Sequence, residues 1–302
     1  GPNGNGSGSN GLLDSLNFLI ETRFKELAKT LEVVNQVKTI EIKINDTATK
    51  LEGKILHKQF ETLLKLVAMR QNVYLYGECG SGKSTGAQMV AESLKLPYGY
   101  SSLNPQSVES RLIGYMDATG NYRASEFNKL YTTGGVYCLD ELDNSSPSLL
   151  TTLNSLLENG HGSFPNGTFP KADNFTLVAT GNTTGDGANM DYPDRRVFDS
   201  AFKERFVYLS WDYDTEMERT IMHSINPSTA MEKAYQWIKD IREAKISTDI
   251  RRLTVSPRAT YKTAGLLANG FDIETIADMV IFKGNIEAKE ALLRECPIPK
   301  LG

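Results

Sequence analysis

Residues 77–84 of this chain read Gly77-Glu78-Cys79-Gly80-Ser81-Gly82-Lys83-Ser84, which fits the P-loop pattern G-x-x-x-x-G-K-[S/T]. A short apolar run at 73–76 precedes this octapeptide, and apolar residues at helical spacing follow it, so we expect a strand, the loop and then a helix. The glycines let successive backbone N–H groups point at phosphate oxygens, and the start of the helix adds its positive dipole end. The octapeptide therefore predicts a cradle for the phosphates of a nucleotide.

Two side chains of this loop carry chemistry that the backbone does not supply. Lys83 can reach the β- and γ-phosphates, and the Ser84 hydroxyl can ligate Mg²⁺. Cys79 occupies a variable position of the pattern, where we expect a small filler rather than a redox switch. The expected nucleotide contacts are Gly77, Glu78, Cys79, Gly80, Ser81, Gly82, Lys83, Ser84 and Thr85.

A second motif is an apolar run that ends in two acids, Val136-Tyr137-Cys138-Leu139-Asp140-Glu141. A carboxylate at the end of a strand beside a P-loop is placed to hold Mg²⁺ through water, and we assign this role to Asp140. The next carboxylate, Glu141, can polarise the attacking water. Acids often only terminate strands, so the functional interpretation of Asp140 and Glu141 depends on the P-loop that precedes them.

Short apolar runs alternate with helical patterns over the middle of the chain. Runs of this kind, separated by helices, indicate a parallel sheet that is covered on both faces. The expected strands are 73–76, 98–102, 136–139, 175–180 and 206–210. After residues 211–214 the strand patterns stop, and the expected helices are 215–225, 229–244, 257–268 and 273–282. The predicted fold class is α/β, a P-loop NTPase parallel sheet covered by helices and followed by a small all-helical lid domain.

The residues before this sheet are predicted to form a separate N-terminal part. Residues 1–11 are rich in Gly, Ser and Asn, which is typical of a flexible linker or an expression scar. An apolar stripe predicts a helix over 12–37, which either packs on its own domain or forms a coiled coil. A period-two strand at 39–44 and a helix at 57–69 follow. The expected division of the chain is 1–11, 12–52, 53–211 for the nucleotide-binding domain and 212–302 for the lid.

The composition indicates in which compartment the protein works and which classes of partner it can bind. Hydrophobic residues make up 40% and charged residues 23% of the 302 residues, the balance of a soluble protein, and no run of about 18 apolar residues predicts a membrane span. Three cysteines, far apart and odd in number, argue against a disulfide framework and favour a reducing cytoplasm. The net charge of −4 lowers the expectation of nucleic-acid binding but leaves a narrow basic channel open.

The order of these motifs resembles the AAA+ family of ATPases. The similarity runs from about residue 57 to residue 268 and includes the stretches 134–144 around the two acids and 150–160 after them. Within the family, the chain is most similar to the MoxR-like and CobS-like, dynein-related branch. The resemblance implies an ATPase that uses ATP and Mg²⁺ and works as a homo-oligomeric ring, a hexamer.

The resemblance also implies roles for polar residues outside the two motifs. Asn182 matches the sensor-1 residue that orients the lytic water, Arg205 matches the arginine finger that reaches a neighbour's γ-phosphate, and Arg258 matches the sensor-2 arginine of the lid. Each has a simpler alternative, because Asn182 can cap a turn, Arg205 can pair with Glu204 or another acid nearby, and Arg258 can be a solvated side chain. Arg195 and Arg196 lie in a stretch similar to one that carries a second trans arginine.

Two further segments resemble insertions of this branch. Residues 114–123 hold a Gly120-Asn121 turn flanked by aromatic residues, and residues 161–169 hold an Asn166-Gly167 turn between two phenylalanines, both of which are hairpin signals. In related rings such hairpins face the pore or the client protein. The alternative is a pair of surface hairpins whose aromatic side chains pack inward.

Three functions of different classes are open at this point. The first is a ring ATPase that remodels or activates a protein partner, which in this branch is often a protein with a von Willebrand A-type domain. The second is a nucleic-acid translocase of the restriction type, kept open by Arg111, Arg123 and Lys129 near the first hairpin. The third is a scaffold whose assembly depends on bound nucleotide and which turns over slowly.

Overall fold

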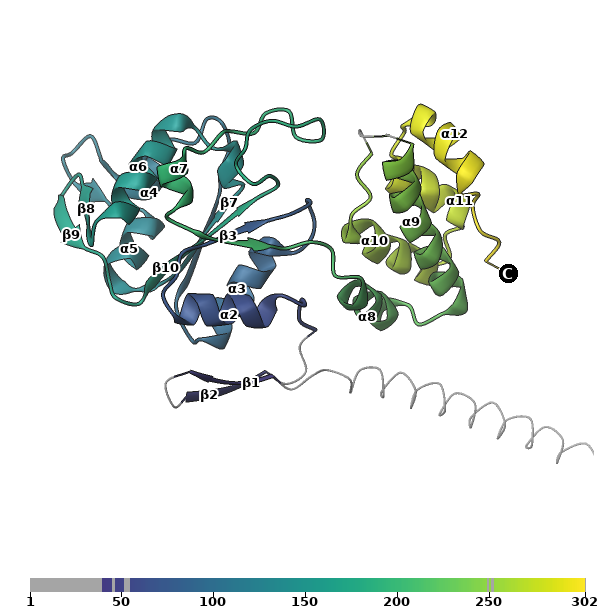
Figure 1. Ribbon diagram of the computed structural model, residues 1–302, viewed down its shortest axis with the longest axis horizontal. Helices are drawn as coiled ribbons and strands as arrows, with labels where there is room; N and C mark the ends of the chain where they lie inside the picture. Colours follow the sequence, from purple (N-terminus) through teal and green to yellow (C-terminus); the bar gives the residue numbers. More distant parts are fainter. Residues whose placement is uncertain (1–39, 45–46, 52–54, 249, 251–252, 302) are drawn as a thin grey trace, which may run out of the picture.

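The structure is a computed structural model that describes residues 40–44, 47–51, 55–248, 250 and 253–301. Figure 1 shows an α/β part around a central sheet, followed along the chain by a part made of helices. The linker predicted at 1–11 and the helix predicted at 12–37 lie outside the described residues. None of the helices in the described ranges has the length and apolar character needed to cross a bilayer.

The central sheet has five parallel strands in the order β11-β3-β10-β7-β4. Their bounds are β3 Val73–Tyr76, β4 Tyr98–Ser102, β7 Gly135–Asp140, β10 Phe175–Gly181 and β11 Val207–Ser210. These bounds confirm the predicted parallel sheet, with β7 and β10 slightly longer and β11 slightly shorter than expected. The carboxyl ends of β3, β10 and β7 lie side by side, so the P-loop, Asn182 and Asp140 meet at one edge of the sheet.

Helices cover both faces of this sheet because successive strand residues point to opposite sides. Val73 and Leu75 pack with α2 (Phe60–Ala68) and α3 (Lys83–Ser93) on one face. Tyr74 between them packs on the other face, in the core that also contains α5 (Glu126–Thr133) and α6 (Pro147–Glu158). Burial on both faces explains why these strands are continuously apolar rather than alternating.

The helical part follows β11 and has a core of its own. Its elements are α8 Thr215–Ile225, α9 Thr229–Ser247, α10 Pro257–Ala268, α11 Ile273–Ile276, the π-helix η2 Ala277–Phe282 and α12 Ile286–Glu295. Met222, Trp237 and Ile241 are among its buried residues. The starts of α8 and α9 are capped by the side chains of Asp214 and Ser228, which accept backbone N–H groups of the first turn. Helical periodicity and caps together account for the predicted helices here.

A buried ion pair joins three of these helices. Arg242 of α9 donates to both carboxylate oxygens of Glu218 of α8, over 2.8 and 2.6 Å. Thr260 of α10 donates its hydroxyl to the same carboxylate. A fully buried carboxylate is stable only when it is paired and hydrogen-bonded, so this cluster fixes how α8, α9 and α10 pack.

The structure adds elements that the sequence pattern did not predict. The strand predicted at 39–44 is β1 (Ile40–Ile44), and it pairs with a second strand, β2 (Thr47–Leu51), to form an antiparallel hairpin. The helix predicted at 273–282 is divided into α11 and the π-helix η2, and η2 buries three successive residues, 280–282, in the same core. The last helix, α12, buries only Ala288 and Leu292, a pattern too sparse to predict from periodicity.

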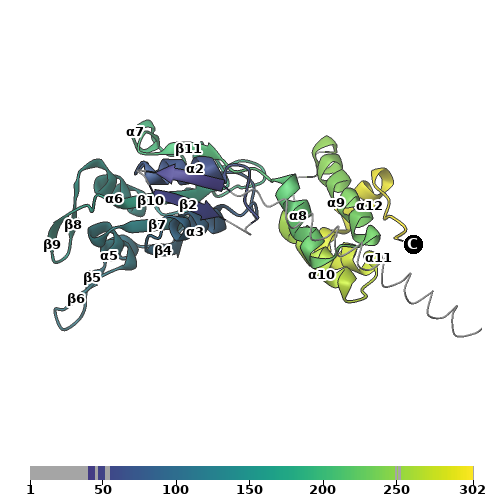
Figure 2. The ribbon, with the colours of Figure 1, turned by 90° about the horizontal axis from the view of Figure 1, so that it is seen from below.

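Both predicted hairpins are present, and they differ in what they expose. The first pairs β5 (Tyr115–Met116) with β6 (Tyr122–Arg123), and the second pairs β8 (His161–Phe164) with β9 (Gly167–Pro170). Figure 2 shows both hairpins at the end of the α/β part that is remote from the helical part. Phe164 of the second hairpin is buried in the sheet core, whereas Tyr115 and Met116 of the first are 55% and 48% exposed. The inward-packing alternative therefore describes the second hairpin, and in the first hairpin it describes Tyr122, which packs against the same core.

Candidate active site

The P-loop connects the end of β3 to the start of α3 and depends on glycine at specific positions. Gly80 and Gly82 have φ angles of 80° and 87°, in the left-handed region that residues with a Cβ rarely adopt. Gly77 is required by close approach, since a Cβ there would lie 2.5 Å from the backbone oxygen of Trp211. The first turn of α3 leaves backbone N–H groups without intrahelical partners, which is the geometry that binds phosphate.

Lys83 is buried at the mouth of this loop and its ammonium group has three oxygen partners. Nζ donates to the carbonyl oxygens of Gly77 and Glu78 over 2.7 and 2.9 Å, and to the side-chain oxygen of Asn182 over 3.1 Å. Burial lowers the pKa of Lys83 to about 8, against the opposing effect of the nearby Asp140 carboxylate. All three partners are neutral oxygens, so the buried ammonium charge gains from a negatively charged phosphate oxygen nearby.

Asp140 ends β7 and is held by residues from the two neighbouring strands. Tyr100 of β4 donates its hydroxyl to Asp140 Oδ2 over 2.8 Å, and Thr180 of β10 donates to Oδ1. Burial raises the pKa of Tyr100 to about 12, so the phenol stays protonated and keeps its donor role. These two bonds orient the carboxylate at the edge of the sheet, beside the P-loop.

The donor set at this edge suits Mg²⁺. A carboxylate and a hydroxyl, from Asp140 and Ser84, are the hard oxygen ligands that Mg²⁺ prefers. Among the described residues, no cluster of three or more His, Cys, Asp or Glu side chains could hold a metal alone. Mg²⁺ characteristically takes one or two protein oxygens and completes its shell with water and substrate phosphates. The residues present therefore fit a Mg²⁺ that arrives with a nucleotide.

Glu141 adopts a backbone conformation that is unusual for its residue type. Its φ and ψ angles are 57° and 43°, in the left-handed region, at the turn between β7 and the short 3₁₀-helix η1 (Leu142–Asn144). Asn144 donates its side-chain N–H to Glu141 Oε2 over 3.3 Å, and the Glu141 side chain is 41% exposed. Such conformations cost about 1–3 kcal/mol and persist where the surroundings demand them, often at functional sites. This turn places the carboxylate next to Asp140 with open access to solvent.

Asp143 is a fully buried carboxylate that joins the Glu141 turn to the end of β10. Its Oδ2 accepts the backbone N–H groups of Asn182 and Thr183 and the Thr183 hydroxyl, each over 2.9 Å. Asn182 is thus held by its backbone, while its side chain contacts Lys83. In the described structure the Asn182 side chain points at the P-loop lysine rather than capping a turn.

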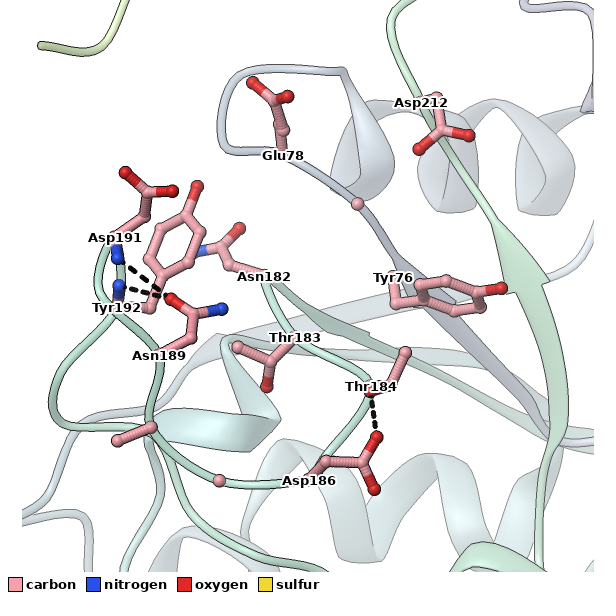
Figure 3. A pocket seen from close by; sticks show the side chains of 13 residues that line it. Tyr76, Glu78, Asn182, Thr183, Thr184, Asp186, Asn189, Asp191, Tyr192 and Asp212 are labelled. Carbon is pink, nitrogen blue, oxygen red and sulfur yellow. Dashed lines mark hydrogen bonds between the residues drawn. The ribbon is translucent and has the colours of Figure 1, made fainter. Parts of the chain in front are cut away.

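The segment that follows Asn182 returns to the site and lines a cavity of about 420 Å³. Figure 3 shows Tyr192 and Asn182 on one side of this cavity and Glu78 of the P-loop above them. The Tyr192 hydroxyl accepts the Cys79 backbone N–H over 3.2 Å, and burial raises the Tyr192 pKa to about 12. Arg195, three residues on, lies in the site of the same chain, with its Nε 3.5 Å from Asp143 Oδ2. The segment therefore contacts the P-loop and the Asp143 carboxylate at once.

Arg205 lies away from its own P-loop, just after α7 (Ser200–Lys203). Its Nη2 is 3.2 Å from Glu158 Oε1, and its Nε donates to Asn154 Oδ1 over 3.4 Å. Both partners belong to α6, which lies beside α7 (Figure 1). The structure thus shows the ion pair with a nearby acid. The pair is partly exposed, and such pairs contribute only about 0–1 kcal/mol, so Arg205 can leave it readily.

Arg258 lies in the first turn of α10, next to the P-loop. A Cβ built on Gly80 would be 2.8 Å from Ser256 Oγ and 3.6 Å from Arg258 Cδ. The Arg258 side chain is exposed, and it lowers the Lys83 pKa slightly by charge repulsion. The helical part thus brings the exposed Arg258 side chain close to the P-loop, where a nucleotide would bind. A lid residue that is only solvated would not need to lie beside this loop.

The linker between β11 and α8 supports the P-loop from behind. Trp211 donates its indole N–H to the Ser81 carbonyl over 3.2 Å, and Tyr213 donates its hydroxyl to the Cys79 carbonyl over 2.9 Å. The Trp211 ring stacks on His57, with centroids 4.1 Å apart. Burial lowers the His57 pKa, which favours a neutral imidazole in this stack. The P-loop carbonyls are therefore tied to the segment that leads into the helical part.

Sequence reasoning missed several residues that shape this site. Thr180 and Tyr100 could have been found from the sheet order, since both lie near the ends of the strands beside β7. Asp143, Tyr192 and Trp211 carry no local signal, because an acid after a motif and an aromatic in a loop are common. Their roles appear only when the chain is folded.

Comparison with known proteins places this geometry in a family. Residues 72–206 match the family model of the AAA domain, dynein-related subfamily. An uncharacterized protein of Staphylococcus epidermidis is 22% identical over 217 residues, covering 69% of this chain and 79% of that protein. A similar protein of Staphylococcus saprophyticus is 22% identical over 223 residues, with the same shares covered.

Solved structures also resemble the chain. NtrX from Brucella abortus has a TM-score of 0.49 and 14% identity, covering 94% of this chain and 65% of that one. A mutant of RuvB from Thermotoga maritima has a TM-score of 0.42 and 18% identity, covering 80% and 81%. The family match spans the P-loop, the two acids that end β7, Asn182 and Arg205. Residues 72–206 therefore match the AAA domain of the dynein-related subfamily and carry the P-loop and the paired acids of an ATPase.

Proposed function

We propose that this ATPase hydrolyses Mg-ATP at sites shared between neighbouring subunits of a ring and uses the resulting motion to remodel or activate a protein partner. Such a role would be like that of MoxR-like and CobS-like ATPases. The observation that carries the proposal is the meeting of Lys83, Asn182 and the Asp140-Glu141 pair at one sheet edge, while Arg205 faces elsewhere. Because Arg205 pairs with Glu158 of α6 and does not reach its own P-loop, a neighbouring subunit would have to supply the arginine finger.

The roles in hydrolysis follow from the contacts. The P-loop and Lys83 bind the phosphates, and Ser84 and Asp140 would hold Mg²⁺, which neutralises charge on the β- and γ-phosphate oxygens. Glu141 accepts a proton from water as the water oxygen bonds to the γ-phosphorus and the bond to ADP breaks. Asn182 orients that water, and Arg205 of a neighbour stabilises the charge that develops on the phosphoryl group.

The surface of the first hairpin supports a protein client. Tyr115 and Met116 expose apolar area at the end of the α/β part, away from the lid (Figure 2). Two of the basic residues nearby are already engaged, because Arg123 pairs with Asp117 over 2.8 Å and Arg111 donates to the Ser102 carbonyl over 3.2 Å. Apolar exposure beside one arginine that is paired with a carboxylate favours a protein, including a von Willebrand A-type partner, over a nucleic-acid backbone.

Steady-state ATP hydrolysis tests the proposal directly. We expect Mg²⁺-dependent turnover that DNA and RNA leave unchanged, and that Lys83→Ala abolishes by weakening nucleotide binding. A several-fold stimulation by single- or double-stranded nucleic acid would instead support the translocase. Slow turnover that ring formation does not accelerate would support the nucleotide-gated scaffold. Pull-down with an ATP-locked Glu141→Gln variant, with and without Tyr115→Ser and Met116→Ser, then tests the client surface.

A further inference from the structure

Arg195 lies deep in the active site of its own subunit. Its side chain is 11% exposed; its Nε is 3.5 Å from Asp143 Oδ2 and its Nη1 is 4.0 Å from Glu141 Oε2. We propose that Arg195 acts in cis as a positioning residue that holds the Glu141 carboxylate in place for the attacking water. This inference rests on the proposed function, in which Glu141 accepts the proton of that water. It differs from the trans contact that the resemblance suggested for this stretch.

The position of Arg195 is determined by Asp143. That carboxylate is fully buried and accepts three hydrogen bonds from Asn182 and Thr183, so it cannot turn away. The Arg196 backbone N–H donates to the Asp143 carbonyl over 2.8 Å, which ties the backbone beside Arg195 to the same residue. If Arg195 reached into a neighbouring subunit, Asp143 would be left buried without its counter-charge, which is strongly unfavourable.

Tyr192 supports the guanidinium from a second direction. The Arg195 guanidinium carbon lies 5.5 Å from the centroid of the Tyr192 ring, within cation–π range. The same tyrosine accepts the Cys79 N–H of the P-loop. A bridge between Asp186 and Val197 closes the base of this segment. Arg195 is therefore held between the P-loop side and the Asp143 side of the site.

The contact between Arg195 and Glu141 is long, and its length suits a general base. A tight bidentate pair would occupy both carboxylate oxygens with guanidinium N–H groups. At 4.0 Å, with Asp143 as the nearer acid, Arg195 attracts Glu141 electrostatically and leaves its lone pairs open to water. The Glu141 carboxylate has one further described partner, the Asn144 side chain at 3.3 Å, and the left-handed backbone of Glu141 leaves the side chain at a turn. The Arg195 charge therefore limits where this carboxylate can point.

Substitution of Arg195 tests the proposal by the division between kcat and KM. For Arg195→Ala we expect kcat to fall about 10- to 100-fold, the loss typical when a partner that orients a catalytic group is removed, with KM for ATP little changed. Arg195→Lys keeps the charge and should recover part of kcat. Arg294→Ala in α12 removes an exposed arginine from outside the site and is the matched control. A wild-type kcat in Arg195→Ala would overturn the proposal.

Coupling to Glu141 separates positioning from a general structural role. In a Glu141→Gln background, Arg195→Ala should cause no further loss of kcat, because its target is already disabled. Equal loss in both backgrounds would show that Arg195 acts elsewhere and would overturn the proposal. If Glu141→Gln itself turned over at the wild-type rate, the base assignment in the proposed function would fall, and the Arg195 proposal with it. If Glu141→Gln has a low kcat while Arg195→Ala has the wild-type kcat, only the Arg195 proposal is overturned.

Loss of Arg195 alone can destabilise the fold, since it leaves Asp143 unpaired. The double variant Arg195→Gln with Asp143→Asn removes both charges and keeps similar size and hydrogen-bonding groups. We expect this variant to melt near the wild-type temperature and still show the reduced kcat. Wild-type turnover by the double variant would overturn the proposal.

Subunit mixing distinguishes a cis arginine from a trans one. Arg195→Ala mixed with Lys83→Ala should recover no activity, because each subunit then carries one defect in its own site. Arg205→Ala mixed with Lys83→Ala serves as the comparison, and differently tagged subunits show co-assembly in both mixtures. Recovery in the Arg195 mixture, above the sum of the separate variants, would assign Arg195 to a neighbouring site and overturn the cis role.

Discussion

The ammonium group of Lys83 lies 3.1 Å from the side-chain oxygen of Asn182, so the P-loop and the end of β10 are joined by a direct hydrogen bond. The Asn182 backbone is held in turn by Asp143, which follows the Asp140-Glu141 pair on η1. Three segments distant in sequence therefore converge on one position. A change in any of these segments therefore shifts the side chains that surround the expected position of the γ-phosphate.

Asn182→Ala should separate binding from turnover. Loss of a positioned polar group that acts on the attacking water lowers kcat by about 100-fold, as for other groups that act mainly in the transition state. Lys83 keeps its two carbonyl partners, so ATP affinity should change little. Steady-state kinetics and fluorescent-nucleotide binding measure the two effects. Asn159→Ala, an exposed residue just after α6, is the control, and an equal loss of affinity and kcat would contradict the role.

Nucleotide binding should depend on pH through Lys83. The free protein holds Lys83 with a pKa of about 8, below its ordinary value because of burial, and bound phosphate favours the charged form. Below pH 8 the lysine is already charged, so affinity is constant; above pH 8 binding must take up a proton, so affinity falls as pH rises. Calorimetry at pH 8 to 9 in buffers of different ionisation enthalpy measures this uptake. Lys83→Arg should bind the nucleotide without taking up a proton, since arginine does not titrate at pH 8 to 9. A wild-type affinity that does not change over this pH range would contradict the prediction.

Glu141→Gln should trap ATP and stabilise the ring. An amide cannot accept the water's proton, so turnover falls by about 10²–10⁴ while the phosphate contacts remain. A nucleotide that contacts two subunits favours the assembled state by mass action. Sedimentation with and without Mg-ATP measures assembly, with the exposed Glu290→Gln as the control. A monomer under both conditions would contradict the shared site.

Arg205→Ala should bind ATP nearly normally and hydrolyse it poorly. A trans arginine contributes about 10³–10⁵ in rate in well-studied GTPases, and we expect a smaller effect here. Mixing with Lys83→Ala should restore part of the activity, since some junctions then join an intact Lys83 site to an intact Arg205. Glu158→Ala removes only the surface partner of Arg205 and should leave turnover near the wild-type rate. If Glu158→Ala lowers kcat as much as Arg205→Ala, the ion pair itself is the functional unit.

Glu218→Ala should destabilise the helical part. It leaves Arg242, whose side chain is 15% exposed, without its bidentate partner and deprives Thr260 of its acceptor, and broken buried pairs lose up to about 3–5 kcal/mol. Chemical denaturation followed by far-ultraviolet circular dichroism measures the loss. Glu290→Ala on the surface of α12 should change stability by less than about 0.5 kcal/mol. A small effect for Glu218→Ala would mean that packing alone holds α8, α9 and α10 together.

Local pattern was sufficient to predict the sheet and the ATP-binding motifs. The strands 73–76 and 98–102 and the helices 215–225 and 257–268 have the predicted bounds, because continuous apolar runs and 3.6-residue periodicity are properties of neighbouring residues. The P-loop is likewise local, since its glycines are required by backbone angles within the loop itself. The roles of Asn182, Arg205 and Arg258 followed from motif order and stay predictions.

The tertiary structure alone decided which polar groups support these motifs. The parallel order β3-β10-β7 aligns the carboxyl ends of strands that are far apart in sequence, and only this alignment brings Asp143 to Asn182. The segment after β10 then folds back, which places Arg195 in its own site and Tyr192 on the P-loop. Burial of a carboxylate requires partners, but any basic or N–H group on any segment can provide them. For that reason a sequence pattern can show where charge lies, while the fold alone determines which charges meet.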